Sequence, residues 1–594
     1  IFRKAPQPLG RVNAMKAHSG ISTAFLLFLW IATVAGFRTV AGSNRRQNPL
    51  DSVKTPRNRP LINRFSEHQR KRTNLQAAQQ EDGGQEGLQS GGSTTGTSSS
   101  HDAVVVGGGP AGLATALTLA RRGWGKVLVL ERRPSADAYE PSLGFTYNID
   151  GRGQKFMKEF GLMEKLKQSG VASDEIFVNR LNPDGSCVET KFPVIDPNAE
   201  TRYWIPRRAF LRILYDEVVD NWSEQIQVLF DSQVTGFEFV EETKEILVKA
   251  KVPGAGAPAV AFRPRLVVAA DGLQSPTREA LSVWAQEGKL SSLDVGGGPG
   301  GTDPYEMKIT RSAAAGLQYK VLTLPPRFQL GKNASALAEP EKIYAITPAV
   351  NDPKISIRLG CLPAKEPNEP RPANIIARAN HPVWGIKDAD EFLAFLKENF
   401  PQVDVPALVS KDQALSFVNT RPGRFCEPQF CPTLAAAAGQ EGAAAVVIVG
   451  DAAHAFPPDL GQGVNSALED VVALGQALDG AGGGATARQL VTAAAEYQRA
   501  RAPEAEALCR LMTLGGPYQY RQSKVGLALW GLNVAFRRAL NALLPRIFSP
   551  QIFMMVSNPQ LSYTQVLAKA NRTTKRIWLL FTLFSSLLIL LVPR

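Results

Sequence analysis

Three glycines with the spacing G-x-G-x-x-G form the clearest candidate for a ligand site: Gly107, Gly109 and Gly112. In such a motif the first glycine permits a tight turn, the second lets a pyrophosphate approach the backbone, and the third allows a helix to pack closely on a strand. The apolar run DAVVV precedes the glycines and a helix-forming run follows them. The next run, KVLVLE, ends in Glu131, where a carboxylate can bind a ribose hydroxyl. This stretch therefore predicts a strand–helix–strand unit that binds a dinucleotide at the helix N-terminus.

The same spacing returns at Gly296, Gly298 and Gly301, but without the elements that a dinucleotide site needs. SSLD precedes this match and TDPYE follows it, and neither segment has the pattern of a buried strand or a helix. Because the motif has meaning only between a strand and a helix, we interpret the second match as a glycine-rich loop. The sequence thus predicts one dinucleotide site.

Two further apolar runs, RLVVAADG and AVVIVGD, also end in a carboxylate next to a glycine. An Asp at the carboxyl end of a strand lies where α/β sheets bind ligands, and the start of the following helix can face an anionic ring edge. FAD has both a ribityl chain and a ring that becomes anionic on reduction, whereas NAD has neither, so the pattern favours FAD. The residues concerned are Asp271 and Gly272 at the end of the first run and Ser275 and Arg278 after it, and Gly450 and Asp451 at the end of the second run and Gly461, Gly463, Val464 and Asn465 after it.

These motifs, in this order, resemble the single-component (class A) FAD monooxygenases, which hydroxylate aromatic rings with NAD(P)H and dioxygen. The resemblance implies FAD as cofactor, NAD(P)H as co-substrate and oxygen transfer through a flavin hydroperoxide. It also implies that Arg208 contacts FAD, with Arg207 as the alternative, and that Pro457 and Pro458 shape a loop over the flavin. The cofactor-binding residues that it implies are Gly107, Gly109, Gly112, Glu131, Arg208, Asp271, Gly272, Gly450, Asp451, Pro458, Gly461, Gly463, Val464 and Asn465.

Three segments resemble the kynurenine 3-monooxygenases in particular: 150–171, 391–401 and 543–567. The substrate pocket departs from that group. Ile176 stands where an Arg binds the substrate carboxylate, and Val194 stands where a Tyr assists that Arg. Arg180, at a neighbouring position, is the candidate to take the place of that Arg.

Few other residues have types and spacing that indicate chemistry. No nucleophile and base form a catalytic pattern, so we predict no catalytic residue, and five scattered cysteines predict no metal site. His454 is expected to have a structural role near FAD, and Asp470 to lie on a helix surface or make an internal hydrogen bond. Asp459 replaces the aromatic residue that follows Pro458 in kynurenine-type enzymes, and we expect Asp459 to be exposed to solvent.

The net charge of +13 does not indicate a nucleic-acid-binding protein, because most of it lies in the N-terminal segment. Residues 1–100 contain 14 Lys and Arg against 5 Asp and Glu, which leaves +4 for all other residues. Small-molecule substrates are therefore expected, and nucleic acid is not. Apolar residues make up 44% of the chain, which is typical of a globular protein.

Both ends of the chain are expected to direct it to a membrane. Residues 1–36 contain an apolar run that predicts a signal peptide, with a retained hydrophobic anchor as the alternative. Residues 37–100 begin with a basic stretch typical of a transit peptide and end, at 81–100, in a Gly- and Ser-rich flexible linker. This layout resembles the bipartite leaders of plastid proteins; the mitochondrial outer membrane and the endoplasmic reticulum are the alternatives. The apolar run at 577–592 predicts a C-terminal transmembrane anchor.

The expected fold is α/β, with a Rossmann-like FAD-binding domain built from separate segments, a β-sheet substrate domain and a C-terminal helical region. The predicted ranges are 101–190, 262–285 and 440–478 for the FAD-binding parts, 191–261 and 286–439 for the substrate parts, and 479–575 for the helical region. The main functional prediction is a membrane-anchored aromatic hydroxylase that consumes NAD(P)H. The alternatives are an FAD-dependent isoprenoid or quinone reductase or epoxidase, and a non-enzymatic binding protein of the same fold.

Overall fold

The computed structural model of the chain describes residues 99–591 with short gaps, and all of these residues belong to one compact unit. The gaps are 137, 139–143, 174–176, 192–199, 254–258, 292, 294–302, 332–335, 366–367, 369 and 439–443. The predicted leader and linker up to residue 98, the second glycine match and positions 176 and 194 therefore lie outside the described residues, whereas Ser99 and Ser100, predicted as linker, begin a strand.

A nine-stranded sheet carries the first glycine motif. Its strands are β1 (Ser99–Val106), β2 (Val127–Leu130), β8 (Ile226–Leu229), β9 (Gln233–Val240), β10 (Glu245–Lys251), β11 (Val260–Ala269), β12 (Leu290–Ser291), β20 (Ala435–Ala438) and β21 (Ala444–Ile448). The parallel part has the order β21-β11-β1-β2-β8. The strands β2 and β21 are apolar and buried at every position, as expected of parallel strands that are covered on both faces.

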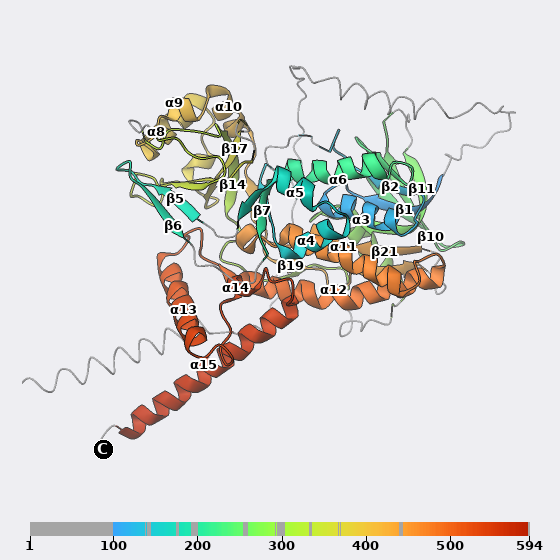
Figure 1. Cartoon of the computed structure of the whole chain (residues 1–594). Coiled ribbons are helices and arrows are strands. Elements are labelled where there is room, and N and C mark those ends of the chain that lie inside the picture. The colour runs from blue at the N-terminus through green and yellow to red at the C-terminus, as the bar shows by residue number, and fades with distance from the viewer. Residues whose placement is uncertain are drawn as a thin grey trace, which may run out of the picture. The chain divides into compact units, whose positions relative to one another are not determined.

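Helices from distant parts of the sequence cover this sheet. They are α3 (Pro110–Arg121), α4 (Gly151–Glu159), α5 (Met163–Ser169), α6 (Arg207–Asn221), α7 (Pro276–Gln286), α11 (Gly463–Gly480) and α12 (Ala487–Gly515). Helix α11 packs on α3, α4 and α12, and α12 reaches β20 and β21 (Figure 1). Apolar residues of these helices and of the sheet form one continuous core.

A second sheet, of seven strands, has the order β18-β14-β17-β16-β15-β5-β6. Its strands are β5 (Phe177–Leu181), β6 (Cys187–Lys191), β14 (Gln318–Leu324), β15 (Ile343–Ile346), β16 (Leu359–Cys361), β17 (Arg371–Ala377) and β18 (Gly423–Arg424). One face packs on α8 (Ala389–Asn399), α9 (Val405–Leu408) and α10 (Lys411–Asn419), and together they form a separate apolar core. The side chains between those core residues lie on the other face, because successive residues of a strand alternate.

Two small antiparallel sheets join these parts. One contains β3 (Thr146–Ile149), β7 (Arg202–Pro206) and β4 (Val171–Ser173); the other contains β13 (Lys308–Ile309), β19 (Gln429–Phe430) and β22 (His454–Ala455). The division of the strands between the two large sheets differs from the domain ranges predicted from the sequence. β8, β9 and β10 join the large sheet although 191–261 is predicted as substrate domain, and β5 lies in the second sheet although 101–190 is predicted to bind FAD. These pairings join segments far apart in the chain, which local pattern does not reveal.

The C-terminal region is helical. It contains α12, α13 (Lys524–Leu543), α14 (Ile552–Met555) and α15 (Tyr563–Leu591). Helices α14 and α15 pack on α12 through a third apolar cluster that includes Met512, Met555 and Val566. The first turns of α15 are therefore part of the folded unit (Figure 1).

The predicted transmembrane anchor at 577–592 is not supported. Within the described part of the chain, no helix is long and apolar enough to cross a membrane. Helix α15 carries basic residues up to Arg576.

Candidate active site

The predicted motifs meet at the carboxyl edge of the large sheet. Val106 is in register with both Leu130 and Ala269, and Ala269 is in register with Ile448. The residues that follow these four strand ends therefore lie side by side: the glycine motif, Glu131, Asp271 and Asp451. This edge is where ligands bind to open parallel sheets.

The three glycines of the motif have different surroundings. A Cβ at Gly107, whose φ is +105°, would lie 2.4 Å from the carbonyl oxygen of Ala270, and a Cβ at Gly112 would lie 1.8 Å from that of Gly107. A Cβ at Gly109 would meet no atom within 4 Å. Tight packing thus explains the first and third glycines, and Gly109 leaves open space at the N-terminus of α3, where no side chain caps the helix.

Glu131 is buried and its carboxylate faces the glycine motif. It accepts a hydrogen bond of 2.7 Å from the N–H of Gly108 and bonds of 2.8 and 3.0 Å from the backbone N–H and Nε of Arg133. Burial alone would raise the pKa of Glu131, but Arg133 and the backbone donors outweigh it and hold this pKa below its usual range. Sequence reasoning missed Arg133, although it lies two residues after the motif's acid in ERRP.

Asp271 begins the loop after β11 and ties it to α7. Its Oδ2 accepts bonds from the backbone N–H (3.1 Å) and hydroxyl (2.7 Å) of Thr277, whereas the buried Oδ1 has no partner. Burial raises the pKa of Asp271. The adjacent Gly272 has a φ of +80°, which favours glycine at this turn.

Ser275 and Arg278 connect this loop to the loop after β21. Ser275 caps α7 by accepting a 3.0 Å bond from the N–H of Arg278. Arg278 donates from Nη1 to the carbonyl of Ala452 at 2.7 Å and from Nη2 to that of Leu273 at 2.8 Å. The two motifs are thus joined directly by one guanidinium group.

Asp451 faces a group of polar residues from the first half of the chain. Its side chain is exposed, and the protein atoms that surround it raise its pKa by disfavouring the charged form. Arg207 and Tyr147 lie within electrostatic range of each other and of Asp451, and burial raises the pKa of Tyr147 to about 12. The structure therefore brings Arg207 to the site, while Arg208 lies on the exposed side of α6.

The start of α11 completes the edge. Gly461 adopts φ +63°, and no side chain caps the helix, so the N–H groups of Gly463 and Val464 remain available to a ligand. Asn465 is fully buried, and its amide donates to the carbonyls of Asn148 (2.8 Å) and Gly461 (2.9 Å). Its side chain therefore holds the loop in place.

The residues at this edge fit FAD. Open space at Gly109, two helix N-termini without side-chain caps and the partnerless Oδ1 of Asp271 are the features that phosphates and ribose or ribityl hydroxyls require.

Comparisons with known proteins agree with this site. A family model described as an FAD binding domain matches residues 100–303 and 435–511. A kynurenine 3-monooxygenase from Salinispora arenicola is 26% identical over 470 residues, which cover 78% of this chain and 90% of that protein. The FAD-dependent monooxygenase spyC from Aspergillus fumigatus is 24% identical over 62% of this chain and 68% of that protein. The chain belongs to the FAD-dependent monooxygenases.

Solved structures include PqsL, a probable FAD-dependent monooxygenase from Pseudomonas aeruginosa. It is 20% identical, with a TM-score of 0.44 over 70% of this chain and 95% of that one. The tetrameric form of 2-methyl-3-hydroxypyridine-5-carboxylic acid oxygenase is 18% identical, with a TM-score of 0.47 over 76% of this chain and 100% of that one.

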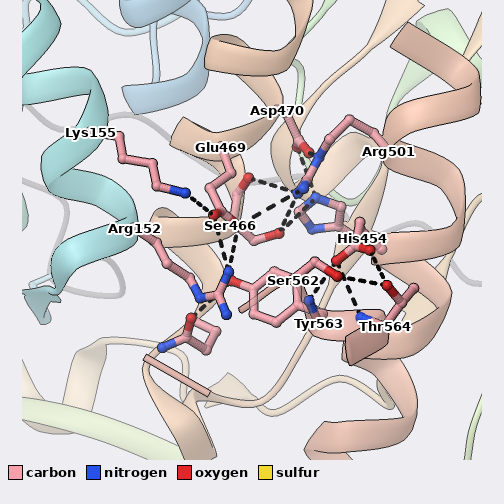
Figure 2. A network of polar contacts seen from close by, with 12 residues as sticks. Arg152, Lys155, His454, Ser466, Glu469, Asp470, Arg501, Ser562, Tyr563 and Thr564 are labelled. Atoms are coloured by element: carbon pink, nitrogen blue, oxygen red, sulfur yellow. Dashed lines mark hydrogen bonds and ion pairs between the residues drawn. The ribbon is translucent and has the colours of Figure 1, made fainter. Parts of the chain in front are cut away.

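In this monooxygenase a buried ionic network, drawn in Figure 2, is bonded to the segment 450–462, which we call the flavin loop. Asp470 of α11 accepts bonds from the N–H of Gly450 (2.9 Å), from Nε2 of His454 (2.8 Å) and from Nε of Arg501 (2.8 Å). Burial would raise the pKa of Asp470, but His454 and Arg501 outweigh it and lower this pKa. Asp470 thus makes internal bonds and has no surface position, and His454 is a structural group.

The network continues to the C-terminal region of the monooxygenase. Glu469 accepts a 3.1 Å bond from Arg152, whose guanidinium lies 4.0 Å from the ring centre of Tyr563 (Figure 2). The Tyr563 hydroxyl donates to Oε1 of Gln462 at 2.9 Å, and Gln462 precedes the first residue of α11. Sequence reasoning missed these residues, because their partners lie hundreds of positions away.

Asp459 corrects one expectation. Its side chain is 8% exposed, whereas the sequence predicted exposure to solvent. The short helix η4 (Pro458–Leu460) packs against the end of α12, and this contact covers Asp459. A Cβ at Gly515 would lie 2.6 Å from Leu460, which shows how closely the two elements approach.

Three arginines gather over the second sheet. Arg358 lies between two residues of the apolar core, Ile357 and Leu359, so its side chain points away from that core. Arg180 precedes the core residue Leu181 in β5, so it lies on the same side as Arg358. Burial, together with the nearby charges of Arg521 and Arg180, lowers the pKa of Arg358 to about 10. Arg521 comes from the loop after α12.

Proposed function

We propose that this FAD-dependent monooxygenase hydroxylates an aromatic or related small molecule that carries an anionic group, and that it consumes NAD(P)H. The observation that supports the cofactor role best is the alignment of four strand ends, which brings the glycine motif, Glu131, Asp271 and Asp451 to one edge. FAD bound there would pass electrons from NAD(P)H to dioxygen, so that one oxygen atom of dioxygen enters the substrate and the other leaves as water.

The chain's own residues bind and orient. In this proposal the N-terminus of α3 and the open space at Gly109 take the pyrophosphate, and Glu131 takes the ribose after exchanging one of its present donors. Asp451 and Arg207 take the ribityl and adjoining groups. The N–H groups of Gly463 and Val464 face the ring edge that gains negative charge on reduction. The network around Asp470 keeps the loop in this geometry.

The arginine cluster supports an anionic substrate. Arg180, Arg358 and Arg521 come from three separate elements, and grouping three positive charges costs free energy unless an anion joins them. A carboxylate suits guanidinium groups because it accepts two parallel hydrogen bonds. Kynurenine carries a carboxylate and is named as substrate by the curated relatives, so it is the first compound to test.

The test is a screen for compounds that accelerate anaerobic reduction of bound flavin by NADPH or NADH. The purified protein should be yellow, and aromatic carboxylates should accelerate reduction and yield hydroxylated products. A colourless, correctly folded protein that does not take up FAD would contradict the cofactor site. Reduced or epoxidised isoprenoids or quinones as the only products would favour the reductase or epoxidase alternative.

A further inference from the structure

One glutamine marks the boundary between the flavin loop and α11. Gln462 stands directly before the first turn of the helix, where a polar side chain can accept hydrogen bonds from the backbone N–H groups that lack a partner within the helix. The side chain of Gln462 makes no such bond, although the residue is only 1% exposed. Residues from two other parts of the chain bind it instead.

Both ends of the Gln462 amide are occupied. Its Oε1 accepts a hydrogen bond of 2.9 Å from the hydroxyl of Tyr563, and its Nε2 donates to Oδ2 of Asp150 at 2.8 Å. The backbone N–H of Asp150 in turn donates to Oδ1 of Asn465, in the first turn of α11, at 3.1 Å. These bonds hold the glutamine side chain away from the start of its own helix, so the N–H groups there remain available to a ligand.

Tyr563 is fixed by contacts that do not involve its hydroxyl. The centre of its ring lies 4.0 Å from the guanidinium carbon of Arg152 (Figure 2). Its backbone N–H donates to Oε2 of Glu504 in α12 at 2.6 Å. Arg152 also donates from Nε to the carbonyl of Val556 at 2.7 Å, which bonds α4 directly to the segment before α15. The protein therefore directs the Tyr563 hydroxyl at Gln462, and removal of the hydroxyl alone leaves the ring in place.

The Gln462 amide would turn elsewhere if this hydroxyl were lost. A buried polar atom without a partner is unfavourable, so a buried amide oxygen takes another donor that lies within its reach. The position of Gln462 before α11 brings the first N–H groups of the helix within that reach. Without the Tyr563 hydroxyl, Gln462 would cap its own helix and occupy the N–H groups that a ligand needs.

We propose that Tyr563 is a positioning residue that keeps the N-terminus of α11 free for the flavin ring, and that it thereby raises the reduction potential of bound FAD. This inference rests on the proposed function, which places the ring edge at Gly463 and Val464. A helix N-terminus carries partial positive charge and stabilises a negative charge beside it. Because the ring edge gains negative charge on reduction, free N–H groups favour the reduced state over the oxidised state.

The experiment measures the reduction potential of FAD bound to the full chain, by anaerobic reductive titration against a reference dye. It needs neither substrate nor turnover. Tyr563→Phe removes the hydroxyl and keeps the ring on Arg152. Tyr344→Phe is the matched control: this hydroxyl accepts a 3.0 Å bond from the N–H of Glu339, and the residue is equally buried, but it lies in the core of the second sheet. Gln462→Leu, alone and combined with Tyr563→Phe, removes the amide through which the hydroxyl acts.

Tyr563→Phe should reduce the preference of the site for reduced over oxidised FAD by about three- to tenfold, the range expected for a charge at a helix terminus. At about 30 mV per tenfold change for two electrons, its potential should fall by about 15–30 mV. Affinity for oxidised FAD should stay the same, and Tyr344→Phe should have the potential of the wild type. Leucine cannot cap a helix, so Gln462→Leu and the double variant should have equal potentials.

An unchanged potential in Tyr563→Phe would overturn the inference, and so would an equal fall in Tyr344→Phe. A fall that persists when Gln462→Leu is the background would also overturn it, because the hydroxyl would then not act through the amide. Loss of oxidised FAD from Tyr563→Phe would have the same consequence, since the hydroxyl would support binding as a whole. FAD content and NADPH oxidation of the wild type report the proposed function alone, so its failure can be distinguished from failure of the role of Tyr563.

Discussion

At the scale of single residues, Gly109 and Gly112 show how one motif combines a binding role with a packing role. Replacing Gly109 by Ala adds a methyl group where the protein has open space, so the free energy of unfolding should not change. FAD should bind at least about tenfold more weakly, because the methyl group occupies space that the pyrophosphate needs. A tenfold loss of affinity corresponds to about 1.4 kcal/mol of binding free energy. Fluorescence titration of the apoprotein with FAD measures this affinity.

The matched change at Gly112 should lower the stability of the protein, unlike the change at Gly109. Its Cβ would overlap a backbone oxygen, so Gly112→Ala should lower the free energy of unfolding by about 3 kcal/mol. Urea unfolding of both apoproteins provides the comparison. Equal loss of stability in the two variants would mean that Gly109 is also a packing residue.

Asp459 should make stability depend on pH. A carboxyl group with a raised pKa binds its proton more tightly in the folded state, so folding loses free energy as the pH rises from about 4, the pKa of an unfolded Asp, to about 7. Asp459→Asn removes this loss. The variant should exceed the wild type in stability at pH 8, by about 1.4 kcal/mol per unit of pKa shift, and by less at pH 5. Urea unfolding without ligand at both pH values tests this, and a gain independent of pH would contradict it.

At the scale of elements, the contact between α11 and α12 depends on charge as well as on apolar packing. Asp470→Asn leaves Arg501 buried without its carboxylate, which should cost about 3–5 kcal/mol of stability and weaken FAD retention. The exposed pair of Glu506 and Arg510 on α12 serves as control, and Glu506→Gln should cost less than about 0.5 kcal/mol. Denaturant unfolding and FAD content distinguish the two, and similar small losses would contradict a supporting role for Asp470.

The second sheet provides a further test at this scale. Arg358→Gln should weaken binding of an aromatic carboxylate such as benzoate by about tenfold or more, because a charge-assisted hydrogen bond is lost. Binding of the uncharged analogue benzamide should change little. Arg421→Gln, an exposed position outside the cluster, is the control. If benzoate and benzamide respond alike to Arg358→Gln, the cluster does not recognise charge.

At the scale of the whole molecule, the C-terminal helix has a part that the fold needs and a part that it does not. Leu579, Leu583 and Phe584 are exposed, whereas Tyr563 is fully buried and bonded to the flavin loop. Deleting residues 579–594 should therefore leave the melting temperature and FAD content unchanged. Deleting residues 563–594 should remove bound FAD, because Gln462 and Arg152 lose their partner. Thermal unfolding and flavin absorbance measure both, and FAD retention after the longer deletion would contradict this coupling.

Prediction from sequence succeeded where a residue's role depends on its neighbours in the chain. The strand–helix–strand unit around Gly107, the helix start at Ser275 and the turn at Gly461 are local patterns, and the structure contains all of them. The choice between Arg207 and Arg208 could not be made in this way, because both begin the same helix. Only the position of β3 and of the loop after β21 shows which of them lies near Tyr147 and Asp451.

By itself, the sequence determined the cofactor and the fold class, since glycine spacing and buried apolar runs restrict the backbone locally. Tertiary structure alone decided the partners of charged residues: the three bonds of Asp470, the contact of Arg152 with Tyr563, and the burial of Asp459. The physical reason is that the free energy of a charge depends on how much water and which opposite charges surround it. Those surroundings come from segments hundreds of residues apart, which meet only when the chain folds.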